Sequence, residues 1–441
     1  MPYVTFAEEL PLRTIARFAG TEAINPESWL VQDPKGALYG TSPLGGANHY
    51  GAVFELPPAG GGARRRVQIV WSSQGFADGY SVAGPLTLYD GSLYGTTFEG
   101  GANGIGTVYR LDPPASHGTV WSHTILHSFG APVVNDGFSP GGLEGGFNGG
   151  LYIDSKGNAY GTTASGGDCT YQYVETSACG VIFAVSASGH YAILHNFQGP
   201  PDGATAGYGL SPAPDGMLYG VTAFGGDATD SSCPLNNNGP FGCGTVFKVD
   251  PQSGTETVIY RFTGGKDGFG PTAPVVVDDK GDVFGTTNNL GGGGSGGGVV
   301  FEITNAGVFR VIHTFKGPDG YEPNAPLSLA GDVLYGTTDA GGGKGKGCIT
   351  RWPGIEGCGV VFSLTPPDLD NKTWTYTVVH RFTGKADGSG CGNYPENCGG
   401  SGLFVGDDGL YGTTEHGGLA TDSNYSGDGT AYMLFDAPVR K

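Results

Sequence analysis

Six aspartates, each followed by glycine, recur at roughly regular intervals along the 441-residue chain. They are Asp78, Asp136, Asp202, Asp267, Asp319 and Asp387. Carboxylates that a repeating fold brings together could hold a cation, a cationic ligand or a sugar, or form the acid/base pair of a glycosidase or lyase. Asp-Gly is also a preferred turn pair, so a purely structural role stays open. Ca²⁺ would suit such a ring, but no copy has the spaced Asp/Asn pattern of a calcium loop. No metal ligand or other cofactor site is predicted.

The eight cysteines also follow a pattern. Three pairs have the same spacing and flank the same loop in three copies of a repeat, and a fourth pair is more closely spaced. Because no CxxC zinc spacing is present, we predict disulfides. The predicted pairs are Cys169–Cys179, Cys233–Cys243, Cys348–Cys358 and Cys391–Cys398. We call the first three enclosed segments the clipped loops.

Aromatic side chains lie within the segments that these cysteines enclose. They are Tyr171, Tyr173, Trp352 and Tyr394. The clipped loops differ from one another although their flanking segments do not, and variable loops on a repeated frame are where binding sites usually lie. Aromatic faces beside carboxylates and amides are suited to sugars. The same rings could instead pack against the undersides of the loops, and both interpretations stay open.

The elements that must position these residues come from one unit repeated seven times. Its signature is "LYGTT" at Leu93, followed by "GTVYRL" at Gly106 and "ILHSF" at Ile125, with a further short apolar run before the next copy. Each run holds five or six β-branched and aromatic residues bounded by Gly, Asp or Pro, which is typical of strands. Four strands per unit and seven units predict an all-β, seven-bladed β-propeller with four antiparallel strands per blade. A solenoid is the alternative, but it would need polar capping repeats at its ends.

The two ends of the chain predict how the ring closes. The last unit stops after its third strand, residues 430–435, and the missing fourth strand resembles residues 13–18 near the N-terminus. We therefore expect an N-terminal strand to complete the last blade and leave no open edge. Residues 1–441 are expected to form one propeller domain, with residues 1–12 as an N-terminal arm and no second domain.

The seven copies can be compared with one another. A glycine stands in the middle of every second strand, and we expect it to allow close backbone approach between blades. The glycines are Gly40, Gly95, Gly161, Gly220, Gly285, Gly336 and Gly412. A second position, in the outer strand, holds histidine in four copies but Tyr260 or Trp71 in others, so packing is expected there. These histidines are His127, His195, His313 and His380.

Composition restricts the partners and the compartment. The formal net charge of -19 argues against nucleic acid, which requires a basic face. No apolar run approaches the length of a membrane span, and the first residues do not have the composition of a signal peptide. Four disulfides would imply an oxidising compartment. We therefore expect an extracellular, periplasmic or cell-surface protein from which a signal has been removed, and a monomer.

The repeated unit, with its "LYGTT" and "GTVF" segments, resembles the GloVer tandem repeat of bacterial secreted and surface proteins. The resemblance extends over nearly the whole chain. It implies export and, in many members, a C-terminal sorting anchor, a pattern that the ending "YMLFDAPVRK" lacks. It implies no catalytic residues.

Three functions are compatible with these patterns. The leading hypothesis is a secreted or cell-surface propeller that binds a carbohydrate or protein ligand on the face bearing the clipped loops. The alternative is a carbohydrate-active enzyme, a glycoside hydrolase or lyase, that uses carboxylates at the channel mouth. The third is a structural surface repeat protein. The sequence has no GxSxG, HExxH or Walker motif, and it leaves open whether the protein is an enzyme.

Overall fold

The computed structural model describes residues 9–18, 23–26, 28–58, 63–82, 84–114, 120–130, 135–140, 149–169, 179–227, 233, 235–236, 239–289, 297–343, 355–368, 372–384, 387–388, 401–417 and 429–435. Within these residues the single helical element is the short 3₁₀ helix η2, Phe76–Asp78. The described part of the chain contains no helix with the length and apolar character needed to cross a membrane.

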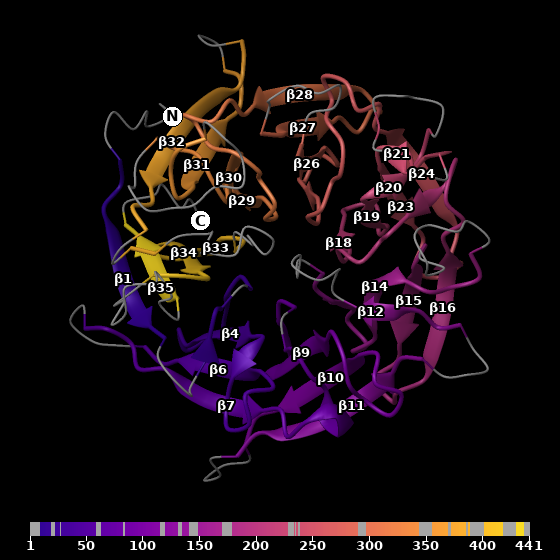
Figure 1. Ribbon diagram of the computed structural model, residues 1–441, viewed down its shortest axis with the longest axis vertical. Coiled ribbons are helices and arrows are strands. Elements are labelled where there is room, and N and C mark those ends of the chain that lie inside the picture. The colour runs from indigo at the N-terminus through magenta and orange to yellow at the C-terminus, as the bar shows by residue number, and fades with distance from the viewer. Residues whose placement is uncertain are drawn as a thin grey trace.

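The strands form seven antiparallel sheets arranged in a ring around a central axis (Figure 1). In order from the axis outward, blade 1 consists of β3 (Val31–Gln32), β4 (Leu38–Ser42), β6 (Ala52–Leu56) and β7 (Gln68–Ser72). Blade 2 consists of β8 (Thr87–Tyr89), β9 (Ser92–Thr97), β10 (Thr107–Asp112) and β11 (Ser122–Ser128). Blade 3 consists of β13 (Tyr152–Ile153), β14 (Ala159–Ser165), β15 (Val181–Val185) and β16 (Tyr191–Asn196). Blade 4 consists of β18 (Ser211–Pro212), β19 (Leu218–Thr222), β23 (Thr245–Val249) and β24 (Glu256–Arg261).

The remaining blades repeat this order. Blade 5 consists of β25 (Val276–Val277), β26 (Val283–Thr287), β27 (Val299–Ile303) and β28 (Phe309–Thr314). Blade 6 consists of β29 (Ser328–Ala330), β30 (Val333–Thr337), β31 (Val360–Thr365) and β32 (Thr375–Arg381). Blade 7 consists of β33 (Phe404–Gly406), β34 (Gly409–Thr414), β35 (Thr430–Leu434) and, from the other end of the chain, β1 (Leu12–Arg17). The predicted seven-bladed propeller is confirmed.

The ring closes as the sequence predicts. β1 pairs antiparallel with β35, with Leu12 opposite Leu434 and Arg17 opposite Thr430. Blade 7 therefore contains strands from both ends of the chain, and Figure 1 shows the first and last strands side by side. Because the fourth strand of blade 7 comes from the N-terminus, this blade has the same four-stranded form as its neighbours.

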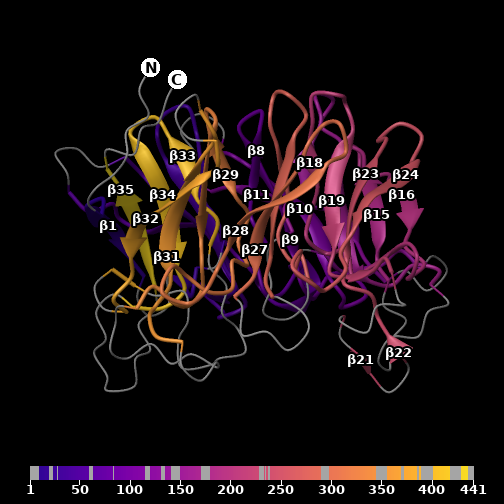
Figure 2. The same ribbon diagram turned by 90° about the horizontal axis from the view of Figure 1, so that it is seen from above.

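Short ribbons supplement the blades on one side of the disc. β2 (Ala23–Ile24) pairs with β5 (Leu44–Gly45), β12 (Phe138–Pro140) pairs with β14, and β17 (Gly203–Ala204) pairs with β20 (Phe224–Gly225). In blade 4, β21 (Leu235–Asn236) and β22 (Gly239–Pro240) form an extra hairpin. Figure 2 shows this hairpin standing away from the four-stranded sheets.

The core is divided among the joints between blades. The seven clusters of buried apolar side chains each combine residues of two consecutive blades. One of them places Ile15 and Phe18 of the closing segment against Leu38 and Phe54 of blade 1. Burial of apolar surface at every joint therefore stabilises both the individual sheets and the closed ring.

The position in the middle of each second strand requires glycine for a different reason from the one that the sequence suggests. Each pairs directly with an aromatic residue of the third strand in its own blade, as Gly40 does with Phe54. A Cβ at Gly40 would lie 2.6 Å from Cζ of Phe54, and one at Gly161 would lie 2.6 Å from Cζ of Phe183. The expectation of backbone approach between blades is thus wrong, because the space is taken by a ring that lies across the glycine within one sheet.

Trp29, which precedes the inner strand of blade 1, reaches the starts of the inner strands of two other blades. A Cβ at Gly150, before the inner strand of blade 3, would lie 3.4 Å from Cζ2 of Trp29. A Cβ at Gly402, before the inner strand of blade 7, would lie 3.1 Å from Cε3 of the same ring. The other copies have glycine or proline at the position of Trp29. One large ring among small residues therefore fills part of the space where the inner strands converge.

Candidate functional site

The two faces of the disc carry different kinds of connection. One face holds the connections from strand two to strand three and from strand four to the next blade; we call it the clipped face. The opposite face, which we call the turn face, holds the connections from strand one to strand two and from strand three to strand four. In the clipped face, Cys169 is bonded to Cys179 and Cys233 to Cys243, as predicted. Both bonds span the connection from strand two to strand three, in blades 3 and 4.

The other predicted cysteine pairs are only partly visible. Cys358 is disulfide-bonded, whereas its predicted partner Cys348, and both Cys391 and Cys398, lie outside the described residues. The aromatic residues predicted for ligand binding, Tyr171, Tyr173, Trp352 and Tyr394, also lie outside them. Their role stays a prediction.

The six predicted aspartates all cap the turn that follows the outer strand. Asp136 accepts the backbone N–H of Gly130 at 2.8 Å, and Asp267 accepts that of Thr263 at 2.8 Å. The corresponding acceptors are Asp78 for Gln74, Asp202 for Gln198, Asp319 for Lys316 and Asp387 for Thr383. The turn chemistry considered in the sequence is therefore present at every one of these sites, and a ligand role for the ring stays a prediction.

Five of these carboxylates also contact a side chain of the outer strand that precedes them. Oδ2 of Asp136 lies 2.9 Å from Nε2 of His127, and the hydroxyl of Tyr260 donates to Oδ2 of Asp267 at 3.0 Å. The corresponding histidine contacts are His195–Asp202 and His313–Asp319, each 3.1 Å, and His380–Asp387 at 3.6 Å. The side chains that these carboxylates contact stand on the outer strands, which form the rim of the disc (Figure 1).

An aromatic stack across the joint completes most of these rim sites. The ring of His127 stacks on that of Tyr191 in the next blade at a centroid distance of 3.9 Å. Equivalent stacks join Trp71 to His123, Tyr260 to Phe309 and His313 to Tyr376. In each case the second ring belongs to the outer strand of the next blade, where it stands four positions before the histidine of that strand. The packing role expected for His127 and His313 is therefore present.

The joint between blades 3 and 4 departs from this arrangement. Glu256 stands where blades 2, 3, 5 and 6 have the stacking ring. Its carboxylate and the ligand atoms of His195 and Asp202 lie within 4.8 Å of one another. Burial, and after it the charge of Asp202, raises the pKa of Glu256 to about 7. Comparison of the repeats could have shown this acidic substitution, but the sequence does not show that its neighbours are themselves a histidine and a carboxylate.

A further His–carboxylate pair follows the second strand of blade 7. Nε2 of His416 lies 3.0 Å from Oε1 of Glu415, and both side chains are buried. Oε2 of Glu415 is buried without a hydrogen-bond partner. The sequence shows that no other copy has a histidine at this place, but it does not show that the pair is buried.

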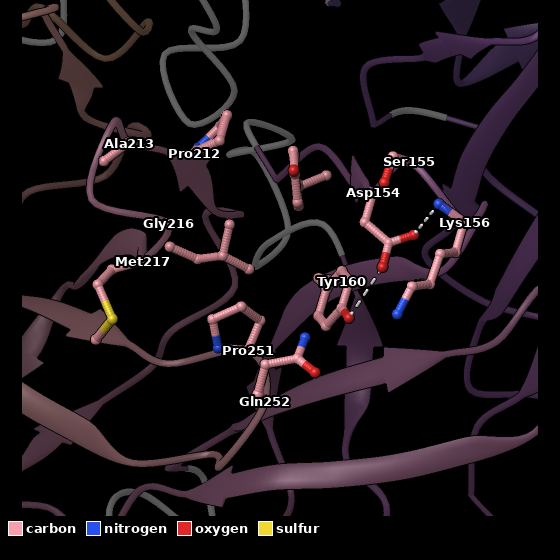
Figure 3. Close-up of a pocket in the computed structure, with 12 residues that line it drawn as sticks. Asp154, Ser155, Lys156, Tyr160, Pro212, Ala213, Gly216, Met217, Pro251 and Gln252 are labelled. Carbon is pink, nitrogen blue, oxygen red and sulfur yellow. Dashed lines mark hydrogen bonds between the residues drawn. The ribbon is translucent and has the colours of Figure 1, made fainter.

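The turn face has a small cavity between blades 3 and 4, which Figure 3 shows in close-up. Its volume is about 220 Å³. The carboxylate of Asp154 in its wall accepts the backbone N–H of Lys156 at 2.9 Å and the hydroxyl of Tyr160 at 3.3 Å. These are contacts within one turn and its strand, so the carboxylate is already engaged in shaping the turn.

A larger cavity of about 830 Å³ lies on the same face where blades 7, 1 and 2 meet. Charges of both signs line it, including Asp33, Lys35 and Asp408. Its Arg65 donates through Nη1 to the backbone carbonyls of Gly36 at 2.8 Å and Leu56 at 3.1 Å. The sequence does not indicate a site here, because the turn residues that line this cavity resemble those of the other blades.

The fold and these sites define a seven-bladed β-propeller built from tandem repeats and carrying disulfide-closed loops. The family model of the Gloeobacter/Verrucomicrobia repeat matches residues 5–152, 73–233, 147–351 and 233–435. The chain therefore belongs to this repeat family, which confirms the resemblance seen in the sequence. No curated protein is significantly similar to it.

Several solved structures are similar in fold. A protein described as an oxidoreductase (glucose dehydrogenase) from Thermus thermophilus is 14% identical, with a TM-score of 0.41, and the match covers 97% of this chain and 100% of that one. The GH74 enzyme of Niastella koreensis is 12% identical, with a TM-score of 0.46 and coverages of 83% and 47%. TolB from Acinetobacter baumannii is 13% identical, with a TM-score of 0.36 and coverages of 76% and 61%. Identities and TM-scores this low say nothing about the activity of this chain.

Proposed function

We propose that the protein is an exported binding propeller that takes a carbohydrate or protein ligand on its clipped face. The observation that carries this proposal is the contrast between a repeated frame and the additions to one face. The seven blades share one four-stranded frame, whereas blades 3 and 4 also close their strand-two to strand-three connections with disulfides. Blade 4 also adds the β21–β22 hairpin there (Figure 2).

The disulfides support both parts of the proposal. Disulfides persist in oxidising compartments, which favours an extracellular, periplasmic or surface location. A closed loop also loses less conformational entropy when it orders around a ligand, so a loop shaped in advance suits binding. The expected aromatic residues would supply flat apolar surfaces for sugar rings or for protein side chains.

A second function is favoured by one specific observation. The buried Glu415–His416 pair has a carboxylate oxygen without a hydrogen-bond partner, and it lies where the connection on the clipped face begins. A carboxylate held beside a histidine in a buried place is the kind of pair that general acid/base catalysis uses. This supports the alternative of a carbohydrate-active enzyme.

One experiment separates these functions. The oxidised protein is incubated with a panel of polysaccharides, and both retention on the polysaccharide and new reducing or unsaturated ends are measured. Retention without new ends is expected. New ends that disappear in Glu415→Gln would instead establish the enzyme.

The site on the clipped face is tested with a matched pair of variants. We expect Tyr171→Ala/Tyr173→Ala to weaken binding, and Lys35→Ala/Asp408→Ala, in the large cavity of the turn face, to leave it unchanged. The reverse result would place the ligand on the turn face and contradict the proposal.

A further inference from the structure

The joint between blades 3 and 4 brings together three side chains that commonly bind metal ions. His195 and Asp202 come from the end of blade 3 and the turn after it, and Glu256 comes from the outer strand of blade 4. One potential ligand atom from each lies within 4.8 Å of the other two. Nε2 of His195 and Oδ2 of Asp202 are 3.1 Å apart, which is close to the separation of neighbouring ligands around a tetrahedral ion with bonds of about 2.0–2.1 Å.

The polar atoms at this joint are not all satisfied by the protein. Oδ1 of Asp202 and Oε1 of Glu256 are both buried without a hydrogen-bond partner. Buried carboxylate oxygens normally have partners, because leaving them bare costs the full desolvation of the group. A cation held between the two carboxylates would satisfy both bare oxygens.

Neighbouring positive groups do not supply that partner. Arg261, whose charge acts on Glu256, donates through Nε to the carbonyl of Pro201 at 2.9 Å. His195 contributes a single ring nitrogen to its contact with Asp202, and its ring has only an edge-on contact with Phe197 among the described residues. Glu256 occupies the position of the outer strand that holds the stacking ring at the joints of His127 and His313.

We propose that His195, Asp202 and Glu256 form a binding site for a divalent transition-metal ion of the zinc type, which links blade 3 to blade 4. One imidazole and two carboxylates are ligands that Zn²⁺ accepts, whereas Ca²⁺ and Mg²⁺ prefer all-oxygen sets. Three protein ligands leave a fourth position for water. The ion replaces, at this joint, the aromatic stack that holds other blades together.

The proposed ion is connected to a clipped loop. The backbone N–H of Gln198 donates to Oδ2 of Asp202 at 3.0 Å, and its side-chain amide donates to the carbonyl of Asp168 at 3.1 Å. Asp168 immediately precedes Cys169, the first cysteine of the blade 3 disulfide. Residues that hydrogen-bond to a metal ligand affect the metal affinity of the site. Binding of the ion and the position of Asp168 at the start of the clipped loop should therefore affect one another.

The test uses the oxidised full-length protein, dialysed against a chelator and then titrated with ZnCl₂ in a calorimeter. We expect one ion per chain and a rise in melting temperature with Zn²⁺, because an ion that binds only the folded state stabilises it. Glu256→Gln should lower the affinity at least about tenfold. Glu256→Tyr, which introduces the ring that blades 3 and 6 have at this position, should abolish binding. Circular dichroism verifies that both variants are folded.

The matched control is His313→Ala, at the joint between blades 5 and 6, where the stacking ring is Tyr376. This variant should bind Zn²⁺ as the wild type does. The proposal is overturned if the wild-type protein binds no Zn²⁺, if it binds Ca²⁺ but not Zn²⁺, if Glu256→Gln binds unchanged, or if His313→Ala removes the ion. Absence of binding combined with a stable Glu256→Tyr would show that the three groups merely share a proton.

Discussion

Two joints of the same ring solve one packing problem in different ways. Between blades 2 and 3, His127 contacts Asp136 and stacks on Tyr191, whose hydroxyl donates to the carbonyl of Asp136 at 2.6 Å. Between blades 3 and 4, the equivalent histidine and aspartate, His195 and Asp202, lie beside Glu256 instead of an aromatic ring. The first joint is satisfied by the protein alone, whereas the second leaves two carboxylate oxygens bare. A repeat thus keeps its frame while one substitution converts a packing contact into a chemical site.

The largest effect is expected when the first joint is made like the second. Tyr191→Glu removes a buried ring and places a carboxylate beside Asp136, so it should lower the free energy of unfolding by about 3 kcal/mol. The measurement is chemical denaturation at neutral pH. Tyr191→Phe is the control; it loses only the hydroxyl hydrogen bond and should cost about 1 kcal/mol. Equal losses in the two variants would mean that the ring stack contributes little.

The disulfide beside the second joint should have the next largest effect. Cys169→Ser/Cys179→Ser opens a loop that spans ten positions, which should lower the free energy of unfolding by about 2.7 kcal/mol in the chain-entropy model. Denaturation of this variant is compared with that of Cys233→Ser/Cys243→Ser, whose loop has the same span. A loss well below about 1 kcal/mol in both would show that the clips do not constrain the unfolded chain.

A third prediction concerns acid. Burial raises the pKa of Asp319, but the hydrogen bonds from His313 and from the backbone of Lys316 outweigh burial, and the net pKa lies below its usual value. The lowered pKa of Asp319 therefore stabilises the folded state. This stabilisation is fully present above the pKa of Asp319 in the unfolded chain, about 3.9, and is lost as the pH falls through its lower pKa in the folded state.

Asp319→Asn should remove this contribution. We expect a loss of about 1 kcal/mol at pH 7 and a smaller loss near pH 3, measured by denaturation at both pH values. The same loss at both would contradict the assignment.

The smallest effect is expected when the second joint is made like the first. In chelated buffer, Glu256→Tyr should raise the free energy of unfolding by about 1 kcal/mol, because it replaces a buried carboxylate by a ring that can stack on His195. Thermal unfolding with and without chelator measures it. If the variant is less stable than the metal-free wild type, Glu256 has a partner that the geometry does not account for.

The repeats determined most of the fold. Strand residues recur between Gly, Asp and Pro in seven copies, and a missing strand at one end matches a segment at the other, so the ring and its closure by β1 and β35 follow from local pattern alone. The two described disulfides also follow, because the two cysteines of each pair flank the same loop of one repeat. The turn role of Asp202 and Asp267, one of the two interpretations that the sequence leaves open, depends on neighbours in the chain for the same reason.

The tertiary structure decided what meets across the joints. Glu256 lies about sixty positions from His195 in the chain, and only the tilt and twist of neighbouring outer strands bring the two together. Trp29 is visible in the sequence as a large residue among small ones, but its contacts with blades 3 and 7 depend on the convergence of the inner strands. Sequence patterns determine strands and turns because those depend on neighbours in the chain. Contacts between blades depend on the geometry of the whole ring, so the site between blades 3 and 4 became visible only in three dimensions.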